Sequence, residues 1–152
     1  MLSLYRVFKR CMGTNEIRNF LKNSAVGFDK VLQKVNIIEA EKGICVAELL
    51  IEEEHTNPMR GLHGGLMATI VDSLTSYALF THEKVQGIPS VSVDLNMTYT
   101  KSVGIGEVIQ IKAETIKAGY TLGFAECTIT NKTSGEVLAK GTHTKYIFRA
   151  DR

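Results

Sequence analysis

The spacing of hydrophobic and polar positions changes along the chain, from a helical period in the middle to strict alternation in the C-terminal half. Between residues 66 and 82, apolar side chains recur every three or four residues, and no Gly or Pro interrupts them. This spacing predicts one long, mostly buried helix. The remaining positions are small or polar: Ala68, Thr69, Asp72, Ser73, Thr75 and Ser76. We therefore expect that face of the helix to lie close against another part of the molecule.

Extended segments flank this helix on both sides. Residues 90–99 alternate strictly, which predicts a half-buried strand with Val91, Val93 and Leu95 on its apolar face and Ser92 on its polar face. The other extended segments are 31–40, 44–51, 107–117, 120–130 and 136–147, and glycine-containing turns punctuate them. Strands joined by such turns pair antiparallel. The pattern predicts an α+β fold in which a six-stranded antiparallel sheet wraps around one long central helix.

Composition fits a single globular domain. The chain has 152 residues, of which 44% are hydrophobic and 22% are charged, and a chain of this size can bury a core of its own. The net charge of +2 is too small to indicate a nucleic-acid partner, and no apolar run approaches the ~18 residues of a membrane span. Cys11, Cys45 and Cys127 are widely spaced without a CxxC motif, which is typical of free thiols in a reducing compartment.

Charge is unevenly distributed. Residues 1–22 carry five basic residues and one acid, a balance of +4, whereas the other 130 residues carry 13 basic and 15 acidic residues, a balance of −2. Two interpretations fit this basic segment: an amphipathic mitochondrial presequence or a solvated N-terminal helix. We therefore predict a basic, helical segment over 1–24, a domain over 25–149, and a mitochondrial or cytoplasmic location.

Two features of the helical segment could carry chemistry. His63-Gly64-Gly65 leads directly into it, and the first-turn amides of a helix have no internal partners, so they could stabilise an oxyanion. The plainer interpretation is a glycine turn. Asp72 lies within the apolar helix, where a carboxylate is costly to bury unless it is paired. It is either hydrogen-bonded to a neighbouring strand or a partner subunit, or it acts as a general base or nucleophile.

The spacing of these two features suggests a second chain. Asp72 lies nine residues after His63, which is about 13.5 Å of helical rise. One copy of the helix could not bring both residues to one carbonyl group, whereas two antiparallel copies in a dimer could. The four histidines show no HxxH or HxxxH pairing, so we expect no metal site.

These residues together resemble a known family. His63 follows Asn57 by six positions, and Asp72 follows His63 by nine, an arrangement similar to that of the hotdog-fold acyl-CoA thioesterases. The likeness runs from about residue 28 to 146 and includes residues 89–96 and 141–145. It implies hydrolysis of medium- to long-chain fatty acyl-CoA to free fatty acid and coenzyme A, without a cofactor. It also implies a homodimer that assembles into a homotetramer with intersubunit sites, with no nucleic acid and no integral membrane association.

The resemblance further implies a role for each matching residue. Asn57 and His63 would orient the thioester, and the Gly64 amide would polarise its carbonyl. Asp72 would come from the neighbouring protomer as general base or nucleophile, and Ser92 would place the attacking water. The coenzyme A part of the substrate would contact Asp94, Tyr99, Lys101, Ser102, Lys117, Gly119, Thr121, Leu122 and Tyr146. From the residues alone we expect Lys101, Lys117 and Lys145 on surface turns or strand ends, where the first two become plausible phosphate partners.

Two other functions remain possible for the same fold. One is a non-catalytic acyl-CoA-binding protein, and the other is a hydratase or dehydratase acting on acyl thioesters. The presence of Asp72 together with Asn57 and Ser92 favours a hydrolase over the binding protein. Pro58-Met59-Arg60 departs from the smaller residues usual in the family, and the family can carry a histidine in place of Tyr146.

Overall fold

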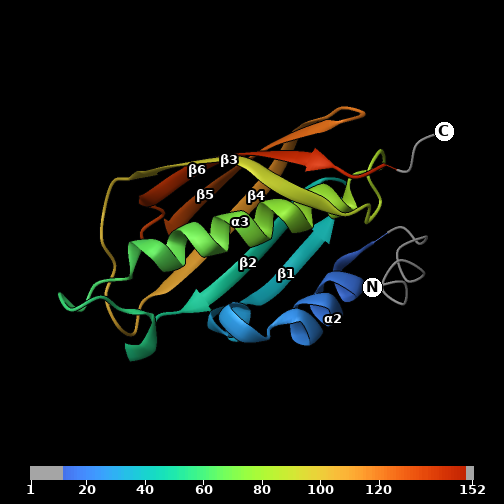
Figure 1. Cartoon of the computed structure of the whole chain (residues 1–152). Coiled ribbons are helices and arrows are strands. Elements are labelled where there is room, and N and C mark those ends of the chain that lie inside the picture. The colour runs from blue at the N-terminus through green and yellow to red at the C-terminus, as the bar shows by residue number, and fades with distance from the viewer. Residues whose placement is uncertain (1–11, 150–152) are drawn as a thin grey trace.

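A six-stranded antiparallel sheet curves around one long helix in the computed structural model, which describes residues 12–149 (Figure 1). The strands follow the order β1-β2-β4-β5-β6-β3 across the sheet. They are β1 (Asn36–Glu41), β2 (Ile44–Leu50), β3 (Ser90–Tyr99), β4 (Val108–Ala118), β5 (Leu122–Asn131) and β6 (Val137–Ile147). The helices are α2 (Thr14–Ser24), α3 (Gly64–Thr81) and two 3-10 segments, η2 (Gly27–Leu32) and η3 (Glu53–His55). The predicted fold class is confirmed.

The boundaries of α3 and of the strands agree with the prediction to within two residues, except for the start of β1. The strand predicted at residues 31–40 begins only at Asn36, because Val31 and Leu32 belong to η2. Leu32 and Val35 are buried three residues apart while Val31 is exposed, which is a helical rather than an alternating spacing. Helix α3 begins two residues early, since Gly64 itself is helical and His63 caps the helix. The first eleven residues, with the presequence interpretation and Cys11, lie outside the described part of the chain. Within the described part, no helix is long and apolar enough to cross a membrane.

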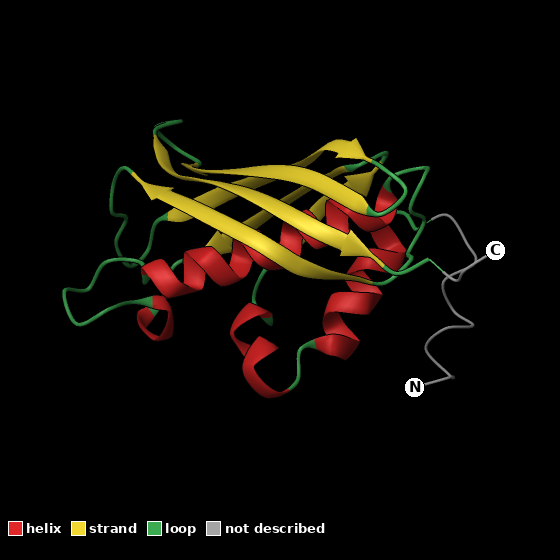
Figure 2. Cartoon of the chain, turned by 45° about the horizontal axis from the view of Figure 1, so that its top comes forward, coloured by secondary structure: helices red, strands yellow, loops and turns green. Residues whose placement is uncertain are grey.

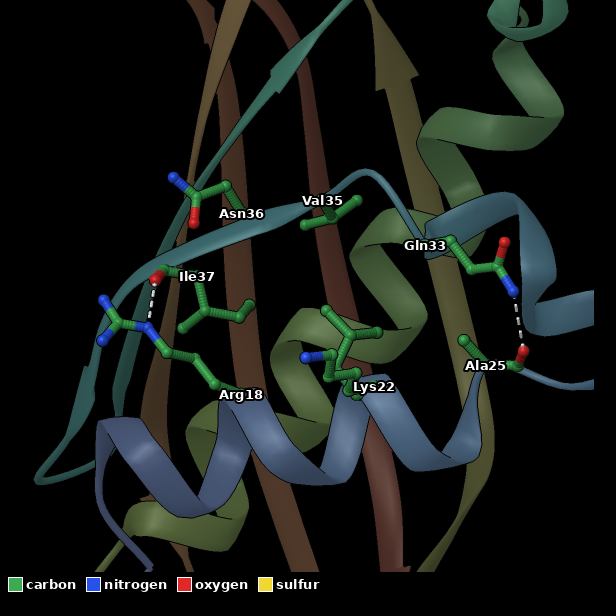
Figure 3. A pocket seen from close by; sticks show the side chains of 8 residues that line it. Arg18, Lys22, Ala25, Gln33, Val35, Asn36 and Ile37 are labelled. Atoms are coloured by element: carbon green, nitrogen blue, oxygen red, sulfur yellow. Dashed lines mark hydrogen bonds between the residues drawn. The ribbon is translucent and has the colours of Figure 1, made fainter.

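The N-terminal helix covers one edge of the sheet. Helix α2 lies beside the edge strand β1, and the Arg18 guanidinium donates to the carbonyl oxygen of Ile37 at 2.8 Å (Figure 3). It also donates to the carbonyl oxygen of Ile38 at 3.0 Å. The Thr14 hydroxyl accepts a hydrogen bond from the Ala40 amide at 3.0 Å. These contacts occupy backbone groups that an edge strand otherwise leaves open to another strand.

The inner face of the sheet packs against α3, and α2 lies on the same side of the sheet (Figure 2). Ile70, Val71 and Leu74 are fully buried in this interface. Gly141 of β6 allows the helix to approach closely, because a Cβ atom added there would lie 2.7 Å from Val71 Cγ1 and 2.8 Å from Met97 Sδ. The missing side chain therefore brings α3 near the end of the sheet formed by β6 and β3.

Strand β3 forms the other edge and contains a β-bulge. Its register against β6 shifts between Ser92, opposite Lys145, and Asp94, opposite Thr144. A bulge inserts one residue into the alternation, so the side chains before and after it exchange faces. Ser92 therefore faces α3, whereas Val91, expected on the apolar inner face, is 48% exposed opposite Tyr146. Ser92 is exposed, as predicted for the polar face, but the strand is not regular and the Ser92 hydroxyl points toward α3.

We expect Gly141→Ala to reduce the free energy of unfolding by about 1–3 kcal/mol, because the added methyl group overpacks the contact with Val71 and Met97. Urea denaturation measures the change. Thr142→Ala, at the exposed neighbouring position of β6, is the control and should have little effect. Equal stability of Gly141→Ala and the parent chain would show that the close approach does not depend on glycine.

Candidate active site

A cluster of polar side chains joins the middle of α3 to the two strands beside it. The Ser92 hydroxyl of β3 donates to Asp72 Oδ1 of α3 at 2.8 Å. His143 of β6 places Nε2 2.9 Å from Ser92 Oγ and 3.3 Å from Asp72 Oδ1. The Asp72 side chain is 47% exposed, and no hydrogen bond from residues 12–149 reaches its second oxygen, Oδ2. The carboxylate is therefore held at one oxygen and open at the other.

A buried layer supports this cluster from below. His143 Nδ1 lies 2.6 Å from the Thr75 hydroxyl oxygen, and the histidine is 1% exposed. Lys145, which is 5% exposed, donates to Ser76 Oγ at 2.6 Å. Its Nζ also lies 3.5 Å from Ser92 Oγ and 3.9 Å from Asp72 Oδ1. The expectation that Lys145 lies at a surface turn or strand end was wrong.

Burial controls the charge of the two basic groups. Desolvation, followed by the nearby Lys145 cation, lowers the pKa of His143 to about 4, against the opposing effects of Asp72 and Asp94. His143 is therefore neutral at physiological pH. Desolvation also lowers the pKa of Lys145, and Asp72 acts in the opposite direction.

These charges allow us to assign the direction of the hydrogen bonds. An ionised Asp72 carboxylate can only accept, so the single Ser92 hydroxyl hydrogen points to Asp72. His143 Nε2 must then carry the ring hydrogen and donate to Ser92 Oγ, which leaves Nδ1 as an acceptor for the Thr75 hydroxyl. The Thr75 hydrogen is shared with the Val71 carbonyl, 2.6 Å away. The chain of hydrogen bonds thus runs from the core toward Asp72.

A second group of candidate residues lies at the N-terminus of α3. His63 caps the helix, and its Nδ1 accepts from the Gly65 amide at 2.9 Å, so a neutral ring carries its hydrogen on Nε2. The Tyr99 hydroxyl donates to the Gly64 carbonyl at 3.0 Å. Among the described residues the Gly64 amide has no hydrogen-bond partner. It is a free donor at the positive end of the helix dipole.

Asn57 belongs to this second group. Its Oδ1 accepts from the amides of Met59 at 2.9 Å and Gly61 at 3.3 Å, which leaves the Nδ2 hydrogens available. Ser102 lies over the same loop, because a Cβ atom at Gly61 would come within 2.2 Å of its hydroxyl oxygen. The loop that carries Asn57 is therefore closed on itself and held against the connection that follows β3.

The predicted catalytic residues thus form two separate groups within one chain. Asn57, His63 and Gly64 lie at the start of α3, whereas Asp72 and Ser92 lie near its middle. Because α3 is continuous from Gly64 to Thr81, the rise of about 13.5 Å between His63 and Asp72 holds. One chain does not bring the two groups to a common substrate atom.

The predicted coenzyme A contacts divide in the same way. Tyr99, Lys101 and Ser102 lie near the start of α3, and Lys101 is paired there with Glu136 at 2.5 Å. The remaining candidates lie farther from the start of α3, on β3, β4, β5 and β6 or in the turn before β5. Leu122 is opposite Tyr146, Asp94 is opposite Thr144, Lys117 is opposite Phe124, and Gly119 and Thr121 form the turn before β5.

Sequence reasoning missed the burial of His143 and Lys145 beside Ser92 and Asp72. Both occupy the inner face of β6, which also carries Ala139, Gly141 and Ile147. The alternation within residues 136–147 could have revealed this burial. His143 and Lys145 fall on the same face of the strand as Ala139, Gly141 and Ile147, and polar side chains on a buried face need hydrogen-bond partners.

Two further features lie away from this cluster. A cavity of about 430 Å³ lies between α2 and β1, beside Arg18, Lys22, Gln33 and Asn36 (Figure 3). Glu52, Glu54 and His55 form one group with metal-ligand spacing in the described part of the chain. The Lys34 ammonium already contacts both of these carboxylates.

Comparisons with known proteins agree with the resemblance seen in the sequence. The family model described as "Thioesterase superfamily" matches residues 60–138. Acyl-coenzyme A thioesterase 13 from Mus musculus is 48% identical over 80% of this chain and 85% of its own length. The Homo sapiens protein of the same name is 42% identical over 88% and 96%. The structure of zebra fish thioesterase superfamily member 2 matches with a TM-score of 0.86 at 42% identity, covering 90% of this chain and 99% of its own.

The low pKa of His143 makes stability depend on pH. An unfolded chain binds a proton at His143 near pH 6.5 and the folded chain only near pH 4, so acid in this range favours unfolding. We expect that, when the pH falls from about 7 to about 5, the titration of His143 lowers the free energy of unfolding by about 2 kcal/mol. Urea denaturation of His143→Gln should lack this part of the pH dependence. An identical pH dependence in both proteins would show that His143 titrates normally.

Proposed function

This chain belongs to the thioesterase superfamily, and we propose that its site hydrolyses acyl-CoA to a free fatty acid and coenzyme A. The observation that carries the proposal is the Asp72 carboxylate, held at Oδ1 by Ser92 and open at Oδ2. The identity to proteins named acyl-coenzyme A thioesterase 13 supports the choice of substrate class.

The start of α3 supplies the groups that bind the thioester. The free Gly64 amide donates to the carbonyl oxygen and stabilises the negative charge that develops there. Loss of one such donor in acyl-transfer enzymes costs about 2.7–4 kcal/mol of transition-state stabilisation. His63 Nε2–H and Asn57 Nδ2–H provide further donors that orient the thioester.

The middle of α3 supplies the base. Asp72 Oδ2 takes a proton from a water molecule, whose oxygen forms the new bond to the thioester carbon. The tetrahedral intermediate then expels the coenzyme A thiolate as the carbon–sulfur bond breaks, and the proton passes to the thiolate. His143 donates to Ser92 and thereby keeps the Ser92 hydrogen on Asp72 Oδ1. This arrangement supports general-base catalysis by Asp72 rather than direct attack on the carbonyl.

Each site is formed by two chains. Strand β3 is an edge strand, and its Val91 and Val93 are 48% and 60% exposed. Antiparallel pairing of two β3 strands sets the Tyr99 end of one copy beside the Ser90 end of the other. The Gly64 amide of one chain then approaches Asp72 of the other, and the two groups of coenzyme A contacts come together.

Dimers associate further into a tetramer. The outer sheet face, which no described helix covers, exposes a cluster of large apolar side chains: Leu122, Phe124, Tyr146 and Phe148. Exposed apolar clusters of this kind mark association or ligand surfaces. The cluster supports contact with a second dimer beside the coenzyme A contacts.

The acyl group is a medium- to long-chain fatty acid. Leu95 and Met97 lie on the side of β3 that faces α3. Leu95 is 36% exposed and Met97 is half-buried, so both offer an apolar wall beside the reacting carbon. A panel of acyl-CoA substrates of graded length, assayed for kcat/KM, measures the preference. Highest activity on acetyl-CoA would contradict this assignment.

We expect Asp72→Asn to lower kcat for palmitoyl-CoA by about 10²–10⁴-fold, because the amide cannot accept the proton of water. Release of free thiol, detected with a thiol reagent, measures turnover. Asp29→Asn makes the same chemical change on the exposed surface of η2 and should leave kcat unchanged. Tight binding of palmitoyl-CoA by the parent chain without thiol release would instead support a non-catalytic binding protein.

Complementation tests the intersubunit site. We expect Asp72→Asn and His63→Ala to be inactive alone, and their refolded equimolar mixture to recover about one quarter of parent activity. Half of the dimers are then mixed, and one of the two sites in each mixed dimer is intact. If both residues acted within one chain, the mixture would stay inactive.

A further inference from the structure

Lys145 is a buried cation next to the proposed base, and the reaction described so far does not use it. Its side chain is 6% exposed, and Nζ contacts Ser76 at 2.6 Å, Ser92 at 3.5 Å and Asp72 at 3.9 Å. It therefore links α3, β3 and β6 at the point where the three elements meet.

An ammonium group is a costly choice for this position if packing is its only purpose. Burying a charged group carries a large desolvation cost, and an apolar side chain of similar volume in such a place is often neutral or stabilising. Apart from His143, the inner positions of β6 near Lys145 are apolar or carry no side chain: Ile147 and Gly141. The charge at Lys145 therefore points to a requirement of the site.

We propose that Lys145 is a positioning residue for thioester hydrolysis, whose ammonium holds Ser92 and Asp72 in place. This inference rests on the proposed function, since it assigns a role within the same reaction. Bound to Ser76, the ammonium is fixed relative to α3 and faces the same Ser92 oxygen that receives the His143 hydrogen. It therefore favours the arrangement in which Ser92 donates to Asp72.

The charged groups around Lys145 support this role. Asp72 faces it from α3 and favours the cationic form of the lysine. His143 lies two residues earlier on β6, and the Lys145 charge lowers the pKa of that imidazole, whereas Asp72 and Asp94 of β3 raise it. Without the cation, the pKa of the imidazole would rise, although burial would still hold it below its ordinary value.

A purely structural role would predict a different outcome. If Lys145 only ties β6 to α3, its replacement would reduce stability without changing the titration of His143. Lys145→Met keeps the length and much of the volume of the side chain and removes the charge. Lys140→Met is the matched control, because Lys140 lies on the exposed face of the same strand.

We expect Lys145→Met to lower kcat for palmitoyl-CoA on the order of 10–100-fold with KM unchanged, because the base is misplaced while substrate binding is retained. In the NMR titration of imidazole C–H signals, the pKa of His143 should rise above about 4 but stay below 6.5, since burial remains. Lys140→Met should match the parent chain in both measurements.

Lys145→Arg keeps the cation and should retain the low pKa of His143 even if its kcat recovers only in part. An unchanged kcat, or an unchanged His143 titration, in folded Lys145→Met would overturn the inference. Circular dichroism and urea denaturation establish that the variant is folded. The parent chain tests the proposed function separately, because absence of thiol release from it would refute hydrolysis, whereas the His143 titration would still report the effect of Lys145.

Discussion

The hydrogen bond between Ser92 and Asp72 joins an edge strand to the central helix, and the arrangement of the site depends on it. The bond exists because the bulge after Ser92 turns this one hydroxyl toward α3 while the rest of the strand keeps its pairing with β6. A regular strand would point Ser92 to the outer face and leave Asp72 without this partner. Gly141 contributes from the neighbouring strand, because its lack of a side chain lets the helix come close enough.

The same region places polar groups where a stable core would have apolar ones. His143 and Lys145 are both buried, and each lies close to a hydroxyl group of α3. Such a layer costs free energy in desolvation, and it is retained where a reaction needs fixed charges and hydrogen-bond directions. Elsewhere the inner face carries buried aliphatic side chains, with Ile109, Ile111 and Ile129 fully buried. Stability and chemistry are therefore carried by different parts of one sheet.

The sequence predicted those elements whose pattern is local. The helical spacing before His82 gave α3 to within two residues, and the unusual position of Asp72 identified its carboxylate as a candidate. The bulge was not predictable, because the alternation of residues 90–99 continues through it and only pairing with β6 reveals the shift. His143 and Lys145 were missed for a related reason: a polar residue in a strand is ordinarily solvated, and its burial depends on which face the sheet turns to the helix. The 3-10 segment at Gly27–Leu32 was missed because short helical turns leave little periodic signal.

The contacts of α2 with β1 have a consequence for the size of the assembly. A sheet with two open edges could add copies at both and grow into a fibre, since each new copy would present a fresh edge. Here Arg18 and Thr14 occupy backbone groups along β1, while β3 remains available at the opposite edge. The proposed pairing through β3 would use the same surface on both chains, so it would close on a twofold axis and end at two copies. In such a dimer the covered edge would limit growth in the direction of the strands' hydrogen bonds, and a larger assembly would have to form through the faces of the sheet.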